Sequence, residues 1–429
     1  MKILIVSNTP WDDSNSFGSS FSNIFGGNEN YEIANIYCQK GKPNTQICSR
    51  FFQINESLIV KSIKDKACSS GREVQNEKRA DMLSSSQEKY LNKAKVLRWQ
   101  VFFWARDLVW ATKKWKSEAL DRFIDDFNPD LIFQPIYYSS YIDEIGLYAK
   151  RRTDKPMVGY ISDDCYTLKQ FSLSPLFWID RLIKRRFVKR AIDECQILYT
   201  ITETQRKEYD GIFGGKCKVL FKGGNFDVIL SPKLLNNPLK LVYTGNLGLG
   251  RWKSLAMISK ALKTINQNGV KAQLYIYSQT PMTAKMKSQL DVRDSSFFMG
   301  SVSASKVKKI QRDADILVHV ESFELSERYK ARLSFSTKIV DYLEAGKCIL
   351  AIGWERTGAI EYLKERDAAL VVTNAQEVNQ VLDRIVSTPS IIHEYAKKGY
   401  QCGKDNHQLE SIREGLYEDL CSVVNNNCI

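Results

Sequence analysis

Hydroxyl and cationic side chains cluster before a helical pattern in residues 333–350, LSFSTKIVDYLEAGKCIL. The hydroxyl residues Ser334, Ser336 and Thr337 precede Lys338, and the apolar spacing that follows predicts a helix. The first N–H groups of a helix have no internal partner, and together with the helix dipole they attract anions. Ser334 or Ser336 would cap the helix, and Lys338 would add a full positive charge. The stretch therefore predicts either a phosphate site or an ordinary capped helix.

A second stretch of this kind is YTGNLGLGRWKSL, residues 243–255. A predicted strand leads into a glycine loop with Gly245 and Asn246, and a predicted helix begins near Arg251 and Lys253. Glycine lets the backbone approach a ligand closely, and the two cations would neutralise a phosphate. The loop is neither the GxGxxG fingerprint nor a P-loop, which disfavours an NAD-dependent oxidoreductase. Two such stretches in one predicted domain suggest a single diphosphate ligand.

Short β-branched or aromatic segments alternate with polar or helical segments along the chain, which predicts an α/β fold. The expected strands form two series: KILIVSN, YEIANIY, DLIFQPI, KPMVGYI and CQILYTIT, then LKLVYTGN, AQLYIYS, DADILVHV, KCILAIG and AALVVT. We therefore expect two Rossmann-like, doubly wound domains that face a cleft at the carboxyl ends of their strands. This cleft is the expected site.

A segment rich in Gly, Asn and Pro separates the two series of strands. We predict an N-terminal domain at residues 1–225, a linker at 226–238 and a C-terminal domain at 239–402. Residues 403–429 contain a helix with one apolar face, which we expect to dock elsewhere, for example on the N-terminal domain. Residues 70–95 are polar and have little apolar periodicity, so we expect an excursion from the first domain.

The charge balance predicts anionic partners. The sequence has 62 Lys and Arg against 49 Asp and Glu, a net charge of +13, which suits nucleotides, anionic lipid or nucleic acid. It begins MKILIVSN, without the pattern of a secretory signal, and contains no apolar run of about 18 residues. Its ten cysteines form no CxxC pair, which predicts reduced thiols in a cytoplasmic protein.

Three segments resemble the donor-binding domain of family-4-type, GT-B-fold glycosyltransferases, especially bacterial surface-polysaccharide members: YTGNLGLGRWKSL, DADILVHVES and LSFSTKIVDYLEAGKCILAIG. The resemblance is strongest over residues 240–375. It implies transfer of a sugar from a nucleotide-sugar, with UDP as the expected nucleotide, to a carbohydrate or lipid-linked saccharide. It also implies retention of anomeric configuration, by a front-face or a double-displacement route, without a metal or another cofactor. Residues 239–402 would bind the donor and residues 1–225 the acceptor.

The resemblance also implies roles for individual residues. The donor-binding residues would be Gly245, Asn246, Arg251, Lys253, Gly300, Ser336, Thr337, Lys338 and Asp341. Arg251, Lys253 and Lys338 would hold the diphosphate, and the base would lie in the loop near Gly300. Asp341, one helical turn inside the second helix, would accept hydrogen bonds from the ribose hydroxyls.

Four acidic residues are candidates for catalysis or for donor contacts. Such enzymes often carry two acidic residues eight positions apart. Glu321 matches the first and Asp341 the second, but the insertion FELSERYKARLSF separates them by twenty positions. Asp163 and Asp164 of YISDDC would orient or deprotonate the acceptor hydroxyl, or else cap a strand end. All three histidines lie in the C-terminal half, so the sugar-side group stays unassigned, and we expect His319 to be a core residue.

Two basic and aromatic segments suggest contact with an anionic membrane surface. Residues 174–192 place an apolar stripe (Leu176, Ile179, Ile183, Phe187 and Ala191) beside five cations (Arg181, Lys184, Arg185, Lys189 and Arg190). Residues 98–116 contain Trp99, Trp104, Trp110 and Trp115. Either these are core helices with solvated basic faces, or they face a membrane that carries a lipid-linked acceptor.

Other functions stay open at this point. A nucleotide-sugar epimerase of GT-B-like fold would share the nucleotide site, but it needs acids and bases that the histidine-free residues 1–225 do not obviously supply. A basic nucleic-acid-binding protein would use the net charge, yet no recognised module supports it. A silent scaffold is also possible, because fold does not guarantee activity. We predict a cytoplasmic, peripherally membrane-bound glycosyltransferase that binds no nucleic acid.

Overall fold

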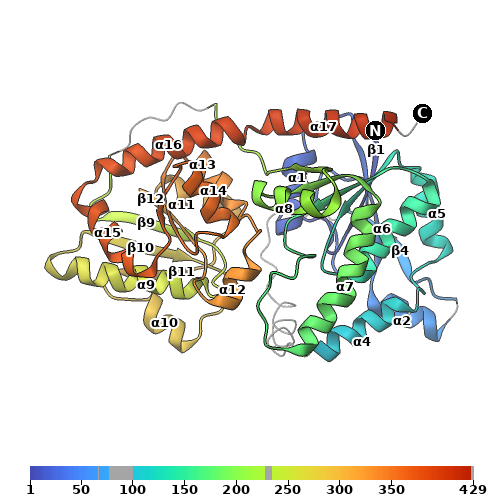
Figure 1. The fold of residues 1–429 in the computed structure, drawn as a ribbon, viewed down its shortest axis with the longest axis horizontal. Coiled ribbons are helices and arrows are strands. Elements are labelled where there is room, and N and C mark those ends of the chain that lie inside the picture. Colours follow the sequence, from blue (N-terminus) through green and yellow to red (C-terminus); the bar gives the residue numbers. More distant parts are fainter. Residues whose placement is uncertain (66, 77–99, 228–233, 427–429) are drawn as a thin grey trace. The chain divides into compact units, whose positions relative to one another are not determined.

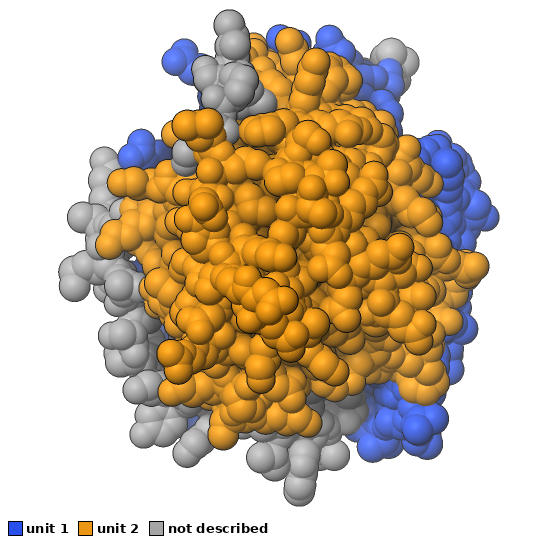
Figure 2. Space-filling view, turned by 90° about the vertical axis from the view of Figure 1, so that its left-hand side faces the viewer, with its two compact units in different colours: residues 1–168, 172–220, 413–429 blue, residues 169–171, 221–412 orange. Residues whose placement is uncertain are grey.

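The computed structural model describes residues 1–65, 67–76, 100–227 and 234–426 of the chain (Figure 1). Two compact units make up the protein (Figure 2). Unit 1 consists of residues 1–168, 172–220 and 413–429, and unit 2 consists of residues 169–171 and 221–412. Trp99, most of the predicted excursion and part of the predicted linker lie outside the described residues.

Unit 1 is built on one eight-stranded sheet in the order β4-β3-β2-β1-β5-β6-β7-β8. All neighbouring strands are parallel except β3 and β4. The strands are β1 (Lys2–Ser7), β2 (Glu32–Tyr37), β3 (Arg50–Ile54), β4 (Gly71–Val74), β5 (Leu131–Pro135), β6 (Met157–Ile161), β7 (Cys195–Thr200) and β8 (Cys217–Val219). Every residue of β5 and β6 is buried, as expected for parallel strands that helices cover on both faces.

The helices of unit 1 include the C-terminal one. They are α1 (Ser16–Phe25), α2 (Glu56–Lys64), α4 (Gln100–Ala111), α5 (Glu118–Phe127), α6 (Ser140–Thr153), α7 (Pro175–Asp193), α8 (Glu203–Phe213) and, from residue 413 onwards, α17 (Leu409–Asn426). Arg413 Nε of α17 donates to the Asn23 carbonyl at 2.9 Å, and the Asp419 carboxylate accepts from the Tyr199 hydroxyl at 2.7 Å. These bonds attach the end of α17 to the rest of unit 1.

Unit 2 has a six-stranded sheet in the order β11-β10-β9-β12-β13-β14, and all its strands are parallel. The strands are β9 (Leu239–Thr244), β10 (Ala272–Tyr277), β11 (Ser296–Gly300), β12 (Ile316–Val320), β13 (Cys348–Ile352) and β14 (Leu370–Val372). The helices are α9 (Arg251–Ile265), α10 (Ala284–Leu290), α11 (Ala304–Arg312), α12 (Leu325–Lys330), α13 (Lys338–Glu344), α14 (Gly358–Glu365), α15 (Val378–Ser387) and α16 (Ser390–Asn406), with 3₁₀ turns at Asn266–Asn268 and Ala375–Glu377.

The expected strands are all present, and the α/β prediction of two parallel, Rossmann-like sheets is confirmed. Four further strands, β3, β4, β8 and β11, were not expected. Three of these, β4, β8 and β11, lie at sheet edges, and the sequences of β4 (GREV) and β8 (CKV) are too short and polar to show a strand pattern. β4 corrects part of the predicted excursion, because Gly71–Val74 pairs antiparallel with β3.

Helix α7 reverses the predicted amphipathic arrangement. Leu176, Ile179 and Ile183 of the predicted apolar stripe are exposed, whereas Arg181 and Lys184 are buried. The prediction of a solvated or membrane-facing basic side is therefore wrong for these two cations. They are buried because acidic side chains of neighbouring segments pair with them, as described below.

Two tryptophans, Trp110 of α4 and Trp115 just after this helix, agree with the alternative expectation that the segment belongs to the core. Trp110 and Trp115 are buried. Trp110 stacks on Tyr141 with ring centres 4.1 Å apart, and its indole N–H donates to Glu56 at 3.0 Å. Both tryptophans are thus part of the interior of unit 1. No helix within the described ranges combines the length and the apolar character needed to cross a bilayer.

Candidate functional site

The strand order of unit 2 reverses between β9 and β12. Ligands of open α/β sheets bind at such a switch point, outside the carboxyl ends of the strands. The segments that meet here are the loop after β9, the residues after β12 and the first turn of α13. Four of the sequence-predicted residues gather at this point: Gly245, Arg251, Glu321 and Lys338.

The Lys338 amine lies at the centre of this cluster. Its Nζ donates to the Thr244 carbonyl at 3.0 Å and lies 5.7 Å from the centre of the Tyr243 ring. Burial lowers the pKa of Lys338 to about 8, and Arg251 lowers it as well, whereas Glu321 and Asp341 act in the opposite direction. The amine is therefore mostly protonated at pH 7 but poorly hydrated. An anion placed beside it would replace the missing water.

Gly245 makes room for the Lys338 amine. A Cβ atom at position 245 would lie 2.1 Å from Lys338 Nζ and 2.9 Å from the Tyr243 hydroxyl. Any side chain here would displace the amine, since real Cβ atoms do not approach other heavy atoms so closely. The glycine thus has a steric role that the sequence alone did not reveal.

Arg251, the first residue of α9, forms a two-pronged ion pair with Glu321. Its Nε donates to Glu321 Oε2 at 3.1 Å, and its Nη2 donates to Oε1 at 3.0 Å. Such bidentate pairs are the stronger kind of ion pair. Glu321 is buried, while the guanidinium keeps some contact with solvent. The carboxylate offsets part of the positive charge of Arg251 and Lys338.

His319 is buried, as expected, but it also lies beside the acidic residue. Its Nε2 is 3.6 Å from Glu321 Oε1. Burial lowers the pKa of His319 to about 3, and the nearby Arg251 and Lys338 charges contribute to the shift. The imidazole is therefore neutral at physiological pH. One sequence signal could have shown this neighbourhood: residues 319 and 321 are two positions apart at a strand end, so their side chains share one face.

Close backbone packing holds the glycine loop against the residues after β12. Gly250 has a positive φ of 73°, and a Cβ there would lie 2.4 Å from Ser322 Oγ. Ser254 Oγ donates to the Glu321 carbonyl at 2.7 Å. Gly353 allows the same approach from β13, because a Cβ there would lie 2.9 Å from Glu321 Cβ. Glu321 is thus fixed by its backbone as well as by Arg251.

Three other predicted donor residues belong to the surrounding loops. Asn246 Oδ1 accepts from the Gly248 N–H at 2.6 Å, so this side chain shapes the glycine loop. Lys253 is ion-paired with Glu324 at the surface. Gly300 ends β11 with a φ of 73°, and its carbonyl accepts from the Ser278 N–H at 2.9 Å. Their contacts with a donor stay predictions.

The start of α13 corrects the predicted cap. The helix begins at Lys338, and Thr337 occupies the N-cap position without a side-chain cap hydrogen bond. The cap position is therefore Thr337 and not Ser334 or Ser336, and Thr337 has helical backbone angles (φ −58°). The carbonyl of Ser336 accepts from the Ile339 N–H at 3.0 Å. A phosphate contact of Ser336 or Thr337 stays a prediction.

Asp341 has a partner that the sequence did not suggest. Its Oδ1 forms an ion pair with Lys222, which lies 119 positions earlier in the chain. Both side chains are partly exposed. Asp341 also borders a small pocket with Lys308 and Arg312 of α11. The carboxylate thus lies among cations beside the Lys338 cluster.

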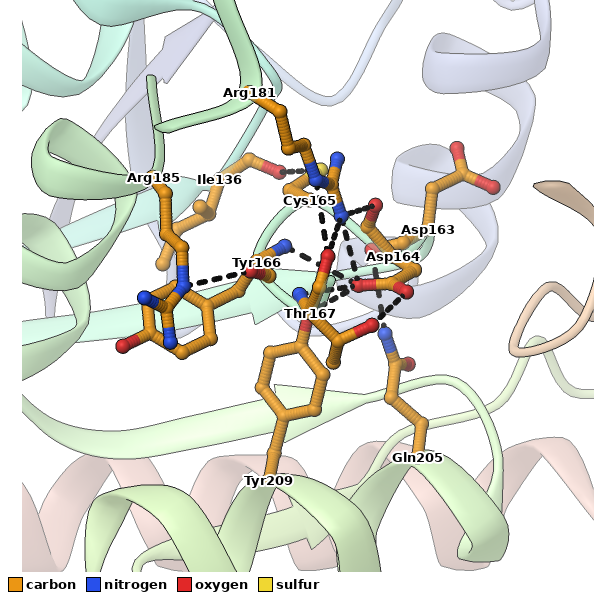
Figure 3. Close-up of polar contacts among 10 residues, drawn as sticks. All are labelled: Ile136, Asp163, Asp164, Cys165, Tyr166, Thr167, Arg181, Arg185, Gln205 and Tyr209. Carbon is orange, nitrogen blue, oxygen red and sulfur yellow. Dashed lines mark hydrogen bonds and ion pairs between the residues drawn. The ribbon is translucent and has the colours of Figure 1, made fainter. Parts of the chain in front are cut away.

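Asp164 of unit 1 is enclosed by hydrogen-bond donors (Figure 3). Its Oδ1 accepts from the Thr167 N–H at 2.8 Å, the Tyr166 N–H at 3.2 Å and the Tyr209 hydroxyl at 3.3 Å. Arg181 Nη2 approaches the same oxygen at 3.2 Å, and the Thr167 hydroxyl donates to Oδ2. The structure therefore favours the alternative expectation for Asp164, because its buried, ion-paired carboxylate caps the turn after β6.

Asp163 lies differently from its neighbour. Its side chain is exposed, and in Figure 3 its carboxylate points away from the donors around Asp164. Its carbonyl accepts from Gln205 Nε2 at 3.3 Å. A role of Asp163 toward an acceptor stays a prediction. Among the residues described, no group of three or more His, Cys, Asp or Glu side chains is arranged to hold a metal ion.

Residues 238–388 match the family model described as glycosyl transferases group 1. This range runs from just before β9 to just beyond α15 and contains the whole Lys338 cluster. Residues 238–388 therefore match the glycosyl transferases group 1 family and the chain has a GT-B fold, which confirms the resemblance seen in the sequence over this range. A search of curated proteins found no match.

Solved structures match both units. Alr3699/HepE from Anabaena in complex with UDP is 13% identical, with a TM-score of 0.64, over 98% of this chain and 100% of that chain. Sucrose-phosphate synthase from Thermosynechococcus elongatus is 13% identical, with a TM-score of 0.64, over 98% and 99%. The UDP-forming trehalose-phosphate synthase from Burkholderia xenovorans, in complex with glucose-6-phosphate, is 10% identical, with a TM-score of 0.59, over 97% and 99%. At these identities the likeness concerns the fold.

The Asp164 environment predicts that two neighbouring carboxylates contribute very differently to the free energy of unfolding. Asp164→Ala leaves the buried Arg181 guanidinium without its acidic partner, which should cost about 3 kcal/mol or more in the free energy of unfolding. Asp163→Ala, at an exposed position, should change it by less than about 0.5 kcal/mol. Urea unfolding followed by circular dichroism measures both. Equal midpoints for the two variants would contradict the structural role of Asp164.

The contact between Gly245 and Lys338 predicts a variant that moves the amine without removing it. Gly245→Ala should displace Lys338 Nζ from the Thr244 carbonyl, since lysine is flexible, and the fold should stay intact. Gly415→Ala is the matched control, because a Cβ there meets no atom within 4 Å. Selective ¹⁵N NMR of the lysine amines should show a perturbed resonance only for Gly245→Ala. Unchanged spectra for both variants would show that the amine lies elsewhere.

Proposed function

We propose that this chain transfers a sugar from a UDP-sugar to a carbohydrate or lipid-linked saccharide. The observation that carries the proposal is the pair of cations at the switch point of unit 2, the poorly hydrated Lys338 amine and the partly exposed Arg251 guanidinium. Two cations beside each other suit a diphosphate. The fold match to HepE in complex with UDP, and to HepE in complex with UDP-glucose, supports UDP as the nucleotide.

The diphosphate would lie against the loop after β9 and the start of α13. Lys338 would donate one hydrogen bond to the diphosphate and keep its hydrogen bond to the Thr244 carbonyl. Arg251 would donate both to Glu321 and to a phosphate oxygen. When the bond between the sugar carbon and the phosphate oxygen breaks, negative charge builds up on the departing UDP. The two cations stabilise this charge more strongly in the transition state than in the bound donor. This difference is what accelerates transfer.

The rest of the donor would contact residues of the same unit. Asp341 would accept from the ribose hydroxyls, and Lys222 would hold its carboxylate in place through their ion pair. The base would lie near Gly300, beside main-chain groups of the loop after β11. Glu321 and the neutral His319 would face the sugar side of the cluster, where a neutral imidazole can donate or accept a hydrogen bond.

Unit 1 would provide the acceptor side, with the exposed Asp163 as the candidate for the acceptor hydroxyl. The acceptor oxygen would lose its proton as it bonds to the sugar carbon, and UDP would leave. The resemblance of the donor motifs to bacterial surface-polysaccharide enzymes supports a polysaccharide or its lipid-linked precursor as the acceptor. It also supports retention of anomeric configuration.

A thermal-shift panel of UDP, GDP, CMP, NAD and a short DNA duplex tests the donor site. At a hundred times its dissociation constant, UDP should add about 2.7 kcal/mol of stability, which raises the Tm by roughly 5–10 °C for a unit of this size. Arg251→Gln should weaken UDP binding by about 10- to 100-fold, because a hydrogen bond to a charged group is lost. Lys263→Gln, an exposed cation on the same helix, is the matched control.

Several results would overturn this proposal. A response to DNA alone would favour a nucleic-acid-binding protein, and no response to any nucleotide would favour a scaffold. If UDP binds, incubation with UDP-glucose and acceptor saccharides separates the two enzyme classes. A transferase releases UDP and extends the saccharide, whereas an epimerase produces a different UDP-sugar without releasing UDP.

The lowered pKa of Lys338 predicts how UDP binding depends on pH. The amine must be protonated to bind the diphosphate, and its pKa in the free protein is about 8, below the usual value for lysine. Affinity for UDP should therefore fall as pH rises through 8, by about tenfold between pH 7 and pH 9. Titration calorimetry at several pH values measures this slope.

Lys338→Met should bind UDP more weakly and without this slope, whereas Lys263→Met should keep it. The phosphates of UDP are largely ionised by pH 7, because a terminal phosphate titrates near pH 6, so they contribute little above that pH. An affinity that is constant or rises from pH 7 to pH 9 in the wild type would exclude Lys338 as a charged ligand.

A further inference from the structure

The outward face of α7 in unit 1 is apolar over its first turns. The exposed fractions are 88% for Leu173, 43% for Leu176, 48% for Ile179, 50% for Leu182 and 47% for Ile183. Leu173 lies just before the helix and the other four lie in it. We call these five residues the α7 apolar face. Leu176, Ile179 and Ile183 recur at helical spacing, so they form one stripe. A surface helix usually turns such a stripe toward the core, but here it faces solvent.

The inward face of the same helix is charged, which fixes this orientation. Asp180 and Lys184 are buried and approach each other to 3.2 Å. Two residues of α4 complete the arrangement: the Trp104 indole donates to Asp180 at 3.0 Å, and Asp107 lies 3.4 Å from the Lys184 amine. Arg181, one residue further along the chain from Asp180, is held by Asp164. Turning the apolar face inward would break all these contacts and leave buried charges unpaired.

Cations continue the outward face where the apolar face ends. Arg186 is seven residues after Ile179 and three after Ile183, so it lies on the same stripe. Arg186 and Arg190 are both exposed. Lys189 is exposed as well, but it is paired with Asp193 at 2.6 Å. The outward face of α7 therefore changes from apolar to basic along the helix.

Helix α4 lies beside α7 (Figure 1). It carries the same combination of exposed apolar and cationic side chains. Leu108 is 70% exposed, and the exposed cations Lys113 and Lys114 follow the helix end. Exposed apolar side chains next to cations are typical of surfaces that bind anionic membranes.

We propose that α7 docks unit 1 on an anionic membrane surface. The α7 apolar face would enter the boundary between headgroups and acyl chains, and Arg186 and Arg190 would lie at the level of the lipid phosphates. A second copy of the chain suits this face less well. In a symmetric dimer the same patch meets itself, so Arg186 and Arg190 of each copy would lie either against the arginines of the other copy or against its apolar residues.

This docking does not depend on the proposed sugar transfer. If the sugar transfer holds as well, the docking indicates the acceptor class. The acceptor would be a saccharide linked to a lipid, presented at the same membrane surface to which unit 1 is bound. The two proposals fail separately, because UDP binding by unit 2 can be measured without vesicles.

Co-sedimentation of the full chain with lipid vesicles tests the docking. The wild type should bind phosphatidylcholine vesicles that contain phosphatidylglycerol, more weakly as salt rises, and should bind pure phosphatidylcholine much less. Arg186→Gln/Arg190→Gln should weaken binding about 30-fold, since each cation near an anionic surface contributes about a fivefold step. Leu176→Ser/Ile179→Ser/Ile183→Ser should weaken it more than tenfold.

Matched controls exist for both variants. Val60→Ser/Ile63→Ser/Ile212→Ser removes three other exposed apolar side chains of unit 1, and Lys260→Gln/Lys263→Gln removes two exposed cations of α9. Both should bind vesicles like the wild type. All variants should keep the Tm and the UDP response of the wild type, because every changed side chain is at the surface.

Three results would overturn the proposal. The first is a wild type that does not bind anionic vesicles. The second is a triple serine variant of the α7 apolar face that binds as well as its control. The third is vesicle binding that is lost only when the two arginines are replaced. Light scattering of the same samples tests whether a second copy of the chain covers the α7 apolar face instead of a membrane. A wild-type dimer that the triple serine variant converts to a monomer, with no change in vesicle binding, would assign the α7 apolar face to a second copy.

Discussion

The position of the Lys338 amine against the end of β9 is the constraint on which the donor site depends. Nζ reaches the Thr244 carbonyl only because residue 245 has no side chain. An amine with so little water is costly, and the drop of its pKa to about 8 reflects that cost. Glu321 compensates in part, and it is fixed there by Arg251, by Ser254 and by the space at Gly353. The two glycines, Arg251 and Glu321 are thus all arranged around the charge of the Lys338 amine.

Two ion pairs with a buried carboxylate, Asp164–Arg181 and Glu321–Arg251, have different roles. In unit 1, Asp164 and Arg181 are both enclosed, and main-chain groups and hydroxyls fill their remaining bonding positions, so the pair closes a turn. In unit 2, Glu321 is buried but Arg251 keeps contact with solvent, and Lys338 has a lowered pKa. Arg251 can therefore give up one hydrogen bond to Glu321 and donate it to an incoming phosphate. Exposure of the cation separates a structural pair from one suited to bind a ligand.

The sequence predicted the strands of both sheets because buried parallel strands are continuous β-branched or aromatic runs. It missed β3, β4, β8 and β11; of these, β4 and β8 are short edge strands with polar residues, GREV and CKV. Periodicity found the stripe on α7 but could not show which side it faces, because the acids that bury Arg181 and Lys184 lie in other segments. Motif spacing located Arg251, Glu321 and Lys338. It could not show the partner of Asp341, since Lys222 is 119 positions away, nor which residue of the Asp163–Asp164 pair is enclosed.

The central claim is that Lys338 and Arg251 together form a diphosphate site at the carboxyl ends of β9 and β12. A crystal structure with UDP tests it most directly. The account predicts phosphate oxygens about 3 Å from Lys338 Nζ and from the Arg251 guanidinium. It also predicts the ribose beside Asp341 and the base near Gly300. UDP bound elsewhere, or a diphosphate that touches neither cation while Arg251 keeps both bonds to Glu321, would contradict it.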